Sequence, residues 1–304
     1  MKKIYTIDPW AIIEDCFRPE YQKMSESIFS IGNGRMGMRA NFEESYSGKS
    51  LQGFYIGGVY YPDKTKVGWW KNGYPEYFAK VLNAPSWIGI FITINGITLD
   101  LSKNIVHSFF RKLDMKQGVL TRIAEVSLSD EIRVIIEAKR FISLVDWQIG
   151  AIEYSIKNLG KDAEIHCELS IDAGIKNQDA NWDETFWTSD TTSNELEYSY
   201  IRSKTKKTEF GVCTGMASEV LYNNIAIQPE YSYCSKETYL SKSFIKHLKS
   251  KDSLTIYKYA AIVTTLHHSY ENLEDVVKQE LYNAKQKGFN TLLSRHINAW
   301  AEKW

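Results

Sequence analysis

The sequence predicts a mainly β protein, a large antiparallel β-sandwich followed by C-terminal helices. Short runs rich in β-branched and aromatic residues recur about every 10 to 15 residues, and most of them alternate between apolar and polar side chains. Glycine and asparagine turn signals separate these runs. From residue 271 onward the apolar spacing changes to the helical period. We therefore expect a β-sandwich domain over residues 1–268 and a helical linker over residues 269–304.

Composition and charge narrow the possible partners. The 304 residues contain 37 Lys and Arg against 37 Asp and Glu, so the net charge is zero. This balance gives no long-range attraction to nucleic acid or to an anionic membrane, and we expect neither as a partner. Aromatic residues make up 13% of the chain. A sandwich core accounts for most of them, although such rings also stack on sugars.

Cysteine spacing and the N-terminal residues predict the compartment. The four cysteines are widely spaced and form no CxxC pair, so they predict reduced, structural thiols and neither a zinc site nor a disulfide framework. The first residues lack an apolar run long enough for a signal peptide, and no segment approaches the ~20 apolar residues of a membrane span. We expect a soluble cytoplasmic protein without a cofactor.

Residues 5–25 are interpreted as a short strand or arm, and residues 26–61 as strands separated by glycine turns. Asp8 could cap a helical turn that has Pro9 at its first position. In the turn around Gly32 and Gly34, Asn33 would also tolerate a positive φ. The pair Gly57-Gly58 lies inside an apolar and aromatic run, where glycine usually marks a bulge or a close backbone approach.

The middle of the chain is a succession of predicted strands. Residues 87–101 form a hairpin around Asn95-Gly96, the strongest short-range hairpin signal. Residues 174–195 are expected to be a polar loop, and Lys204, Lys206 and Lys207 to lie at a solvated hairpin tip. Further strands are predicted at 106–113, 119–128, 132–141, 148–157, 163–171, 196–203, 209–216, 225–234, 236–248 and 253–264.

Two helices are predicted at the C-terminal end. The first ends at Gly288, a residue typical of helix C-termini. The second carries an apolar stripe that we expect either to fold back on the sandwich or to bury itself against another copy. The stripe contains Phe289, Leu292, Leu293, His296, Ile297, Trp300 and Trp304.

Residues 26–87 resemble the start of glycoside hydrolase family 65, the disaccharide phosphorylases, and most of all its maltose phosphorylases. The residues that carry the resemblance are Glu26-Ser27, Ile31-Gly32-Asn33-Gly34, Met36-Gly37-Met38-Arg39, Asn41-Phe42-Glu43-Glu44, Gly53 to Tyr61 and Asn83 to Trp87. The resemblance implies a super-sandwich domain whose helices lead into an (α/α)6 catalytic barrel beyond residue 304. The whole chain is similar to the N-terminal part of such a protein.

The resemblance also implies the reaction of the parent protein. Inorganic phosphate attacks the anomeric carbon of maltose, and β-glucose 1-phosphate and glucose are released with inversion. One carboxylic acid protonates the leaving oxygen. In the family that acid and the phosphate-binding residues lie in the barrel, so we predict no catalytic residue here and an inactive isolated chain. The implied partners are the barrel of the same chain, the disaccharide, phosphate and a possible homodimer partner; kojibiose, nigerose or trehalose could replace maltose.

Several groups of polar residues are candidate sites, but the sequence favours a structural role for each of them. Glu43 and Glu44 would point to opposite faces of a strand, so they could not easily flank one bond and are expected to hold a turn. The same alternation argues against a metal site at His267-His268. The GNGRMG sequence at 32–37 follows no βαβ pattern, so it is no dinucleotide site. Asp179, Asp183 and Glu184 lack EF-hand spacing and are expected to lie in a loop packed by its own tryptophans.

One loop is the predicted contact surface. It contains Trp69, Trp70, Lys71, Asn72 and Tyr74, and exposed tryptophan pairs are unfavourable unless a partner covers them. The loop is a candidate either for contact with carbohydrate near the barrel mouth or for packing against a domain or subunit. A stand-alone carbohydrate-binding module, which would also use Trp182 and Trp187, and a subunit-interaction module remain the alternatives to an accessory domain.

Overall fold

The computed structural model describes residues 4–66, 73–178 and 184–304, and two large antiparallel sheets dominate them. Eleven of the described strands form the larger sheet. In spatial order they are β1 (Thr6–Asp8), β2 (Ala11–Glu14), β10 (Ile105–Asp114), β11 (Val119–Ser127), β12 (Arg133–Ile142), β13 (Ile149–Asn158), β21 (Ser253–Thr264), β17 (Gly211–Tyr222), β16 (Ser199–Thr205) and β15 (Trp187–Asn194), with β18 (Ile225–Ile227) paired to β17.

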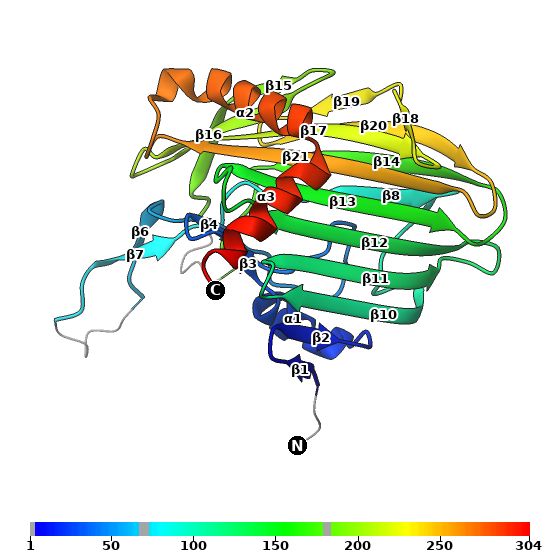
Figure 1. Cartoon of the computed structure of the whole chain (residues 1–304). Coiled ribbons are helices and arrows are strands. Elements are labelled where there is room, and N and C mark those ends of the chain that lie inside the picture. Colours follow the sequence, from blue (N-terminus) through cyan, green and yellow to red (C-terminus); the bar gives the residue numbers. More distant parts are fainter. Residues whose placement is uncertain (1–3, 67–72, 179–183) are drawn as a thin grey trace.

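The second sheet stacks behind the first (Figure 1). Its order is β19 (Ser232–Ser235), β20 (Tyr239–Leu248), β14 (Ala163–Asp172), β8 (Ile90–Ile94) and β9 (Ile97–Thr98). Alternate residues of both sheets point inward, so Ile136 and Ile256 share one fully buried cluster with Ile92, Ile165 and Leu169. The predicted sandwich is confirmed.

Two small sheets lie at one end of the sandwich. β3 (Ile31–Gly32), β4 (Met36–Met38) and β5 (Phe54–Ile56) form a three-stranded sheet. The strands β6 (Tyr60–Lys64) and β7 (Tyr77–Val81) pair as a hairpin that projects from the body of the domain (Figure 1).

The helices near the C-terminus cover the outer face of the larger sheet (Figure 1). After the 3-10 turn η2 (Tyr270–Asn272) come α2 (Leu273–Lys287) and α3 (Phe289–Ala301), with Gly288 between them at φ +72°. Val277, Leu281 and Leu292 are fully buried in a second core. The apolar stripe therefore folds back on the sandwich, the first of the two outcomes expected from the sequence.

Several local predictions are confirmed because their signals are local. Asn95 and Gly96 both have positive φ, 47° and 79°, as a two-residue hairpin turn requires, and they join β8 to β9. Gly57 N–H donates to the carbonyl of Arg35 at 2.7 Å, which is the close backbone approach expected of this glycine.

Four local expectations differ from the structure. Asp8 caps a turn between β1 and β2, with its Oδ1 accepting from Trp10 N–H, and starts no helix. Asn33 is absent from the positive-φ residues; its side chain shapes the turn instead, with Oδ1 accepting from the N–H groups of Arg35 and Met36. The helix α1 (Gln22–Ile28), preceded by η1 (Pro19–Tyr21), lies where an arm and a strand were expected. Strand β15 lies within the stretch read as a polar loop, because at a sheet edge Thr and Ser fit a half-exposed strand.

Candidate functional site

A buried ionic cluster joins the resemblance-bearing segment to the larger sheet. The cluster consists of Glu14, Glu43 and Glu44 with Arg111, Arg122 and Arg140, all at most 4% exposed. The three arginines lie on the neighbouring strands β10, β11 and β12 at positions where side chains face the interior.

Each arginine donates to a carboxylate, and Arg111 and Arg140 also donate to a backbone carbonyl. Arg122 donates to Glu44 through two hydrogen bonds of 2.7 and 2.6 Å, and to Glu43 at 2.8 Å. Arg140 donates to Glu43 at 2.9 Å and to the carbonyl of Arg39 at 3.0 Å. Arg111 donates twice to Glu14 and once to the carbonyl of Ala40. The segment 39–44 is therefore anchored by side chain and by main chain.

Glu26 anchors the other end of the same segment. Its carboxylate accepts hydrogen bonds from Ser50 Oγ and from Leu51 N–H, both at 2.6 Å, and from Gln22 Nε2 at 3.1 Å. Its carbonyl accepts from Ala40 N–H. Helix α1 and the loop after β4 thus pack as one unit, and Glu26 has a structural role in joining them.

The electrostatic environments of Glu43 and Glu44 differ. Burial opposes ionisation of Glu43, but Arg140 and Arg122 outweigh it and hold the pKa of Glu43 below its usual value. Burial, helped by the charge of Glu43, raises the pKa of Glu44 despite Arg122. Both side chains converge on one guanidinium, so the premise that they point to opposite faces was wrong. Residues 43 and 44 form a bend and no strand.

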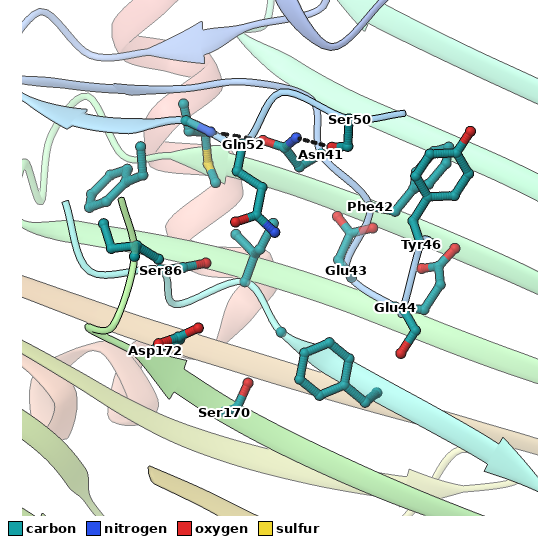
Figure 2. Close-up of a pocket in the computed structure, with 18 of the residues that line it drawn as sticks. Asn41, Phe42, Glu43, Glu44, Tyr46, Ser50, Gln52, Ser86, Ser170 and Asp172 are labelled. Atoms are coloured by element: carbon teal, nitrogen blue, oxygen red, sulfur yellow. Dashed lines mark hydrogen bonds between the residues drawn. The ribbon is translucent and has the colours of Figure 1, made fainter. Parts of the chain in front are cut away.

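A cavity of about 140 Å³ lies beside the cluster (Figure 2). Its walls come from the loop after β4, the segment before β8 and the ends of β14 and β20. In Figure 2 the side chains of Gln52, Ser86 and Asp172 point into the same space. Burial raises the pKa of the Asp172 carboxyl, which accepts a hydrogen bond from Gly174 N–H at 2.8 Å.

Lys258 holds together two segments that line this cavity. Its fully buried Nζ donates to the carbonyls of Gly89 and Ser170, each at 2.8 Å, and so ties β21 of the larger sheet to the smaller sheet. Burial and the neighbouring Lys242 lower the pKa of Lys258 well below its usual value. A Cβ at Gly89 would lie 2.3 Å from Ser170 Oγ, so a larger residue there would require the Ser170 side chain to move.

The predicted contact loop is only partly within the described residues. Trp69, Trp70, Lys71 and Asn72 lie outside them. Tyr74 is 51% exposed, and its ring packs edge-on against Phe78 with centroids 6.0 Å apart. Tyr77, Phe78 and Val81 of β7 are also 44–55% exposed, so the β6–β7 hairpin carries exposed apolar side chains.

The acidic stretch is likewise divided. Asp179, Trp182 and Asp183 lie outside the described residues. Glu184 accepts a hydrogen bond of 2.6 Å from Tyr61 Oη, and buried Trp187 donates from Nε1 to the carbonyl of Asn83. Both residues have structural partners, as expected for a packed loop.

The histidines have separate environments. His267 packs against Trp147 and its Nε2 lies 3.2 Å from Arg35 Nη1, whereas His268 Nε2 lies 3.1 Å from Gln148 Nε2. His296 packs α3 onto the sheet, as expected of a helix-packing histidine. Within residues 4–66, 73–178 and 184–304, no group of three or more potential ligands is placed to hold a metal ion.

Sequence reasoning missed the residues that line the cavity. Gln52 and Asp172 are 120 positions apart, and neither belongs to a pattern of catalytic or binding residues. The only local hint was the pair of glycines at 48 and 53, which frame the loop that forms one wall.

Comparison with known proteins identifies the family of this domain. The model of "Glycosyl hydrolase family 65, N-terminal domain" matches residues 12–303. The chain therefore belongs to glycoside hydrolase family 65, and the resemblance read from residues 26–87 is confirmed.

Several of the curated relatives are disaccharide phosphorylases. The chain is 35% identical over 303 residues to the maltose phosphorylase of Bacillus subtilis, a match that covers all of this chain and 39% of that protein. It is 24% identical to the kojibiose phosphorylase of Thermoanaerobacter brockii, covering 98% and 38%. A solved structure of a putative kojibiose phosphorylase from the human microbiome superposes with a TM-score of 0.88 at 23% identity, over 98% of this chain and 38% of that one, and supports the fold.

The chain thus spans about two-fifths of the length of the curated relatives it matches. In the described part of the chain, no helix is both long and apolar enough to cross a membrane.

Proposed function

We propose that this chain is the non-catalytic N-terminal domain of a disaccharide phosphorylase that acts on maltose and inorganic phosphate. The observation that carries the choice of maltose is the 35% identity to a maltose phosphorylase over the full chain, against 24–25% for the kojibiose and trehalose phosphorylases of Thermoanaerobacter brockii. The parent would release β-glucose 1-phosphate and glucose.

The state of the buried carboxylates supports a non-catalytic role. A phosphorylase needs one accessible acid and a cationic site for phosphate. Glu43 and Glu44 are occupied by Arg122 and Arg140: Arg122 donates to both glutamates, and Arg140 donates to Glu43 and to the carbonyl of Arg39. The acid and the phosphate site would then lie in a barrel domain of the longer parent. The four cysteines are unpaired, which favours a cytoplasmic parent.

Measuring glucose 1-phosphate release tests both parts of the proposal. We expect no release from maltose and phosphate by this chain alone, and release by a version extended through the barrel domain. Phosphorolysis by the short chain would contradict the non-catalytic role. An extended chain that cleaves kojibiose or trehalose but not maltose would contradict the substrate.

We further propose that the loop with Trp69, Trp70, Lys71, Asn72 and Tyr74 contacts another part of the parent, either the barrel or a second subunit. The exposed side chains of Tyr77 and Phe78 on the adjoining strand support this role, because apolar surface of this kind is usually covered. Hydroxyl-radical footprinting of the short and the extended chain tests it. We expect Tyr77 and Phe78 to be labelled in the short chain and protected in the extended one. Equal labelling of the two residues in both chains would contradict the contact.

A further inference from the structure

We propose that the cavity beside the ionic cluster binds one neutral sugar ring. The inference rests on the lining of the cavity alone. It does not depend on the proposed function, since binding is read without turnover.

The polar side of the cavity offers a set of groups suited to adjacent hydroxyls. Gln52 supplies an amide donor and acceptor, Asp172 a carboxylate acceptor and Ser86 a hydroxyl, and the three point into the same space (Figure 2). Among the described residues, the side chains of Gln52 and Ser86 make no hydrogen bond. They can therefore accept a ligand without breaking existing contacts.

Apolar side chains also line the cavity. They include Ile88, Phe91 and Ile175. Apolar side chains combined with a few polar groups are the usual composition of a small-molecule site. A pyranose has this pattern, with C–H groups on its faces and hydroxyls around its rim.

Charge excludes an anionic ligand. The charged side chains that line the cavity are Glu43, Glu44 and Asp172, and no lysine or arginine does. The guanidinium groups of Arg122 and Arg140 are turned to the glutamates and do not line the cavity. Inorganic phosphate and sugar phosphates would meet only negative charge and should not bind.

Size limits the ligand to one ring. The cavity volume of about 140 Å³ is well below the ~300–1,000 Å³ of sites that take drug-sized ligands, so it offers room for a single ring. Of the lining residues, Gln52 is exposed, whereas Ser170 and Glu43 are buried, so we expect a ligand to enter past the amide.

Titration of the isotope-labelled chain with D-glucose, followed by ¹H–¹⁵N NMR, tests the inference. We expect saturable shifts at millimolar glucose in the amides of Gly89, Ser170 and Gly174, and no such shifts with inorganic phosphate. Absence of saturable shifts at tens of millimolar glucose would overturn the proposal. Phosphate binding at the same amides would overturn it too, because the charge argument would be wrong.

Variants of residues that line the cavity test where glucose binds. Gln52→Ala and Asp172→Asn should each raise the Kd for glucose by about three- to tenfold, the loss of one or two hydrogen bonds. Gln117→Ala is the matched control, because Gln117 is also exposed but lies in the β10–β11 turn. Thermal melts establish that each variant is folded. Unchanged affinity in both cavity variants, or an equal loss in the control, would show that glucose binds elsewhere.

Discussion

Arg122 and Glu44 meet inside the domain through two parallel hydrogen bonds, from Nη1 to Oε1 at 2.7 Å and from Nη2 to Oε2 at 2.6 Å. The planar fork of the guanidinium fits the two carboxylate oxygens, which adds geometric specificity to the pair. Because an unpaired buried charge is far more costly than a pair is favourable, sliding the segment 41–44 by one residue along β11 would be strongly disfavoured. The pair therefore sets the register of the loop that forms the cavity wall.

Arg122→Met should destabilise the domain by about 3–5 kcal/mol, since it leaves Glu43 and Glu44 buried near a single remaining cation. The measurement is the free energy of unfolding in urea. The matched control is Arg133→Met on β12, where Arg133 pairs with Glu125 at 2.5 Å but is 47% exposed. The control should cost less than about 1 kcal/mol. Equal losses in the two variants would mean that the buried cluster holds no special place in stability.

The environment of His296 predicts that the domain loses stability in mild acid. Its Nδ1 accepts from Leu144 N–H, so the neutral ring carries its proton on Nε2 and donates to the carbonyl of Gly118. Burial lowers the pKa of His296, although the backbone acceptors at Gly118 and Gln117 oppose this. Below about pH 6.5 the unfolded chain therefore takes up a proton that the folded chain resists, so the free energy of unfolding decreases as the pH decreases.

The comparison that checks this is the free energy of unfolding against pH for the wild type and His296→Gln, which cannot take up the proton. We expect the wild type to lose stability more steeply below about pH 6.5. Parallel curves would contradict the assignment. NMR titration of the ring should place the pKa of His296 below that of a histidine in a peptide.

Lys242 predicts a variant that is more stable than the wild type. It is 1% exposed on β20, and its Nζ lies 4.9 Å from the ring centre of Tyr231. Burial, with a contribution from Lys285, lowers the pKa of Lys242 to about 8. Holding the charge inside costs stability at neutral pH, so Lys242→Met should stabilise the domain by about 2 kcal/mol at pH 7.

The sign of the pH dependence provides a second check on Lys242. Between pH 8 and the usual lysine value the unfolded chain binds more protons than the folded one, so wild-type stability rises with pH relative to the variant. The advantage of Lys242→Met should therefore shrink toward pH 10. Lys246→Met, a half-buried position on the same strand, is the control and should change stability by less than about 1 kcal/mol. A destabilised Lys242→Met would refute the interpretation.

Features that depend on local signals could be predicted from the sequence, and features that depend on distant contacts could not. The strands and the Asn95-Gly96 hairpin could be predicted because alternation and turn chemistry act over a few residues. Arg111, Arg122 and Arg140 looked like ordinary strand residues, since their partners lie 71 to 101 positions away in the chain. An inward-facing arginine has no local signature, and neither does a cavity assembled from Gln52 and Asp172. The site could be found only once the sheets had been assembled.

Gly118 should control how the last turn of α3 attaches to the sheet. It has φ +66°, and a Cβ there would lie 2.2 Å from Nε1 of Trp300, a ring that also stacks on Trp304. Gly118→Ala should therefore cost about 2–4 kcal/mol and release the C-terminal turn to proteolysis. Gly34→Ala separates the two causes, since Gly34 has φ +85° but open space around it, and should cost only about 1–2 kcal/mol with the tail still protected. Cleavage within α3 at equal rates in both variants would show that backbone strain alone, and not contact with Trp300, accounts for the effect.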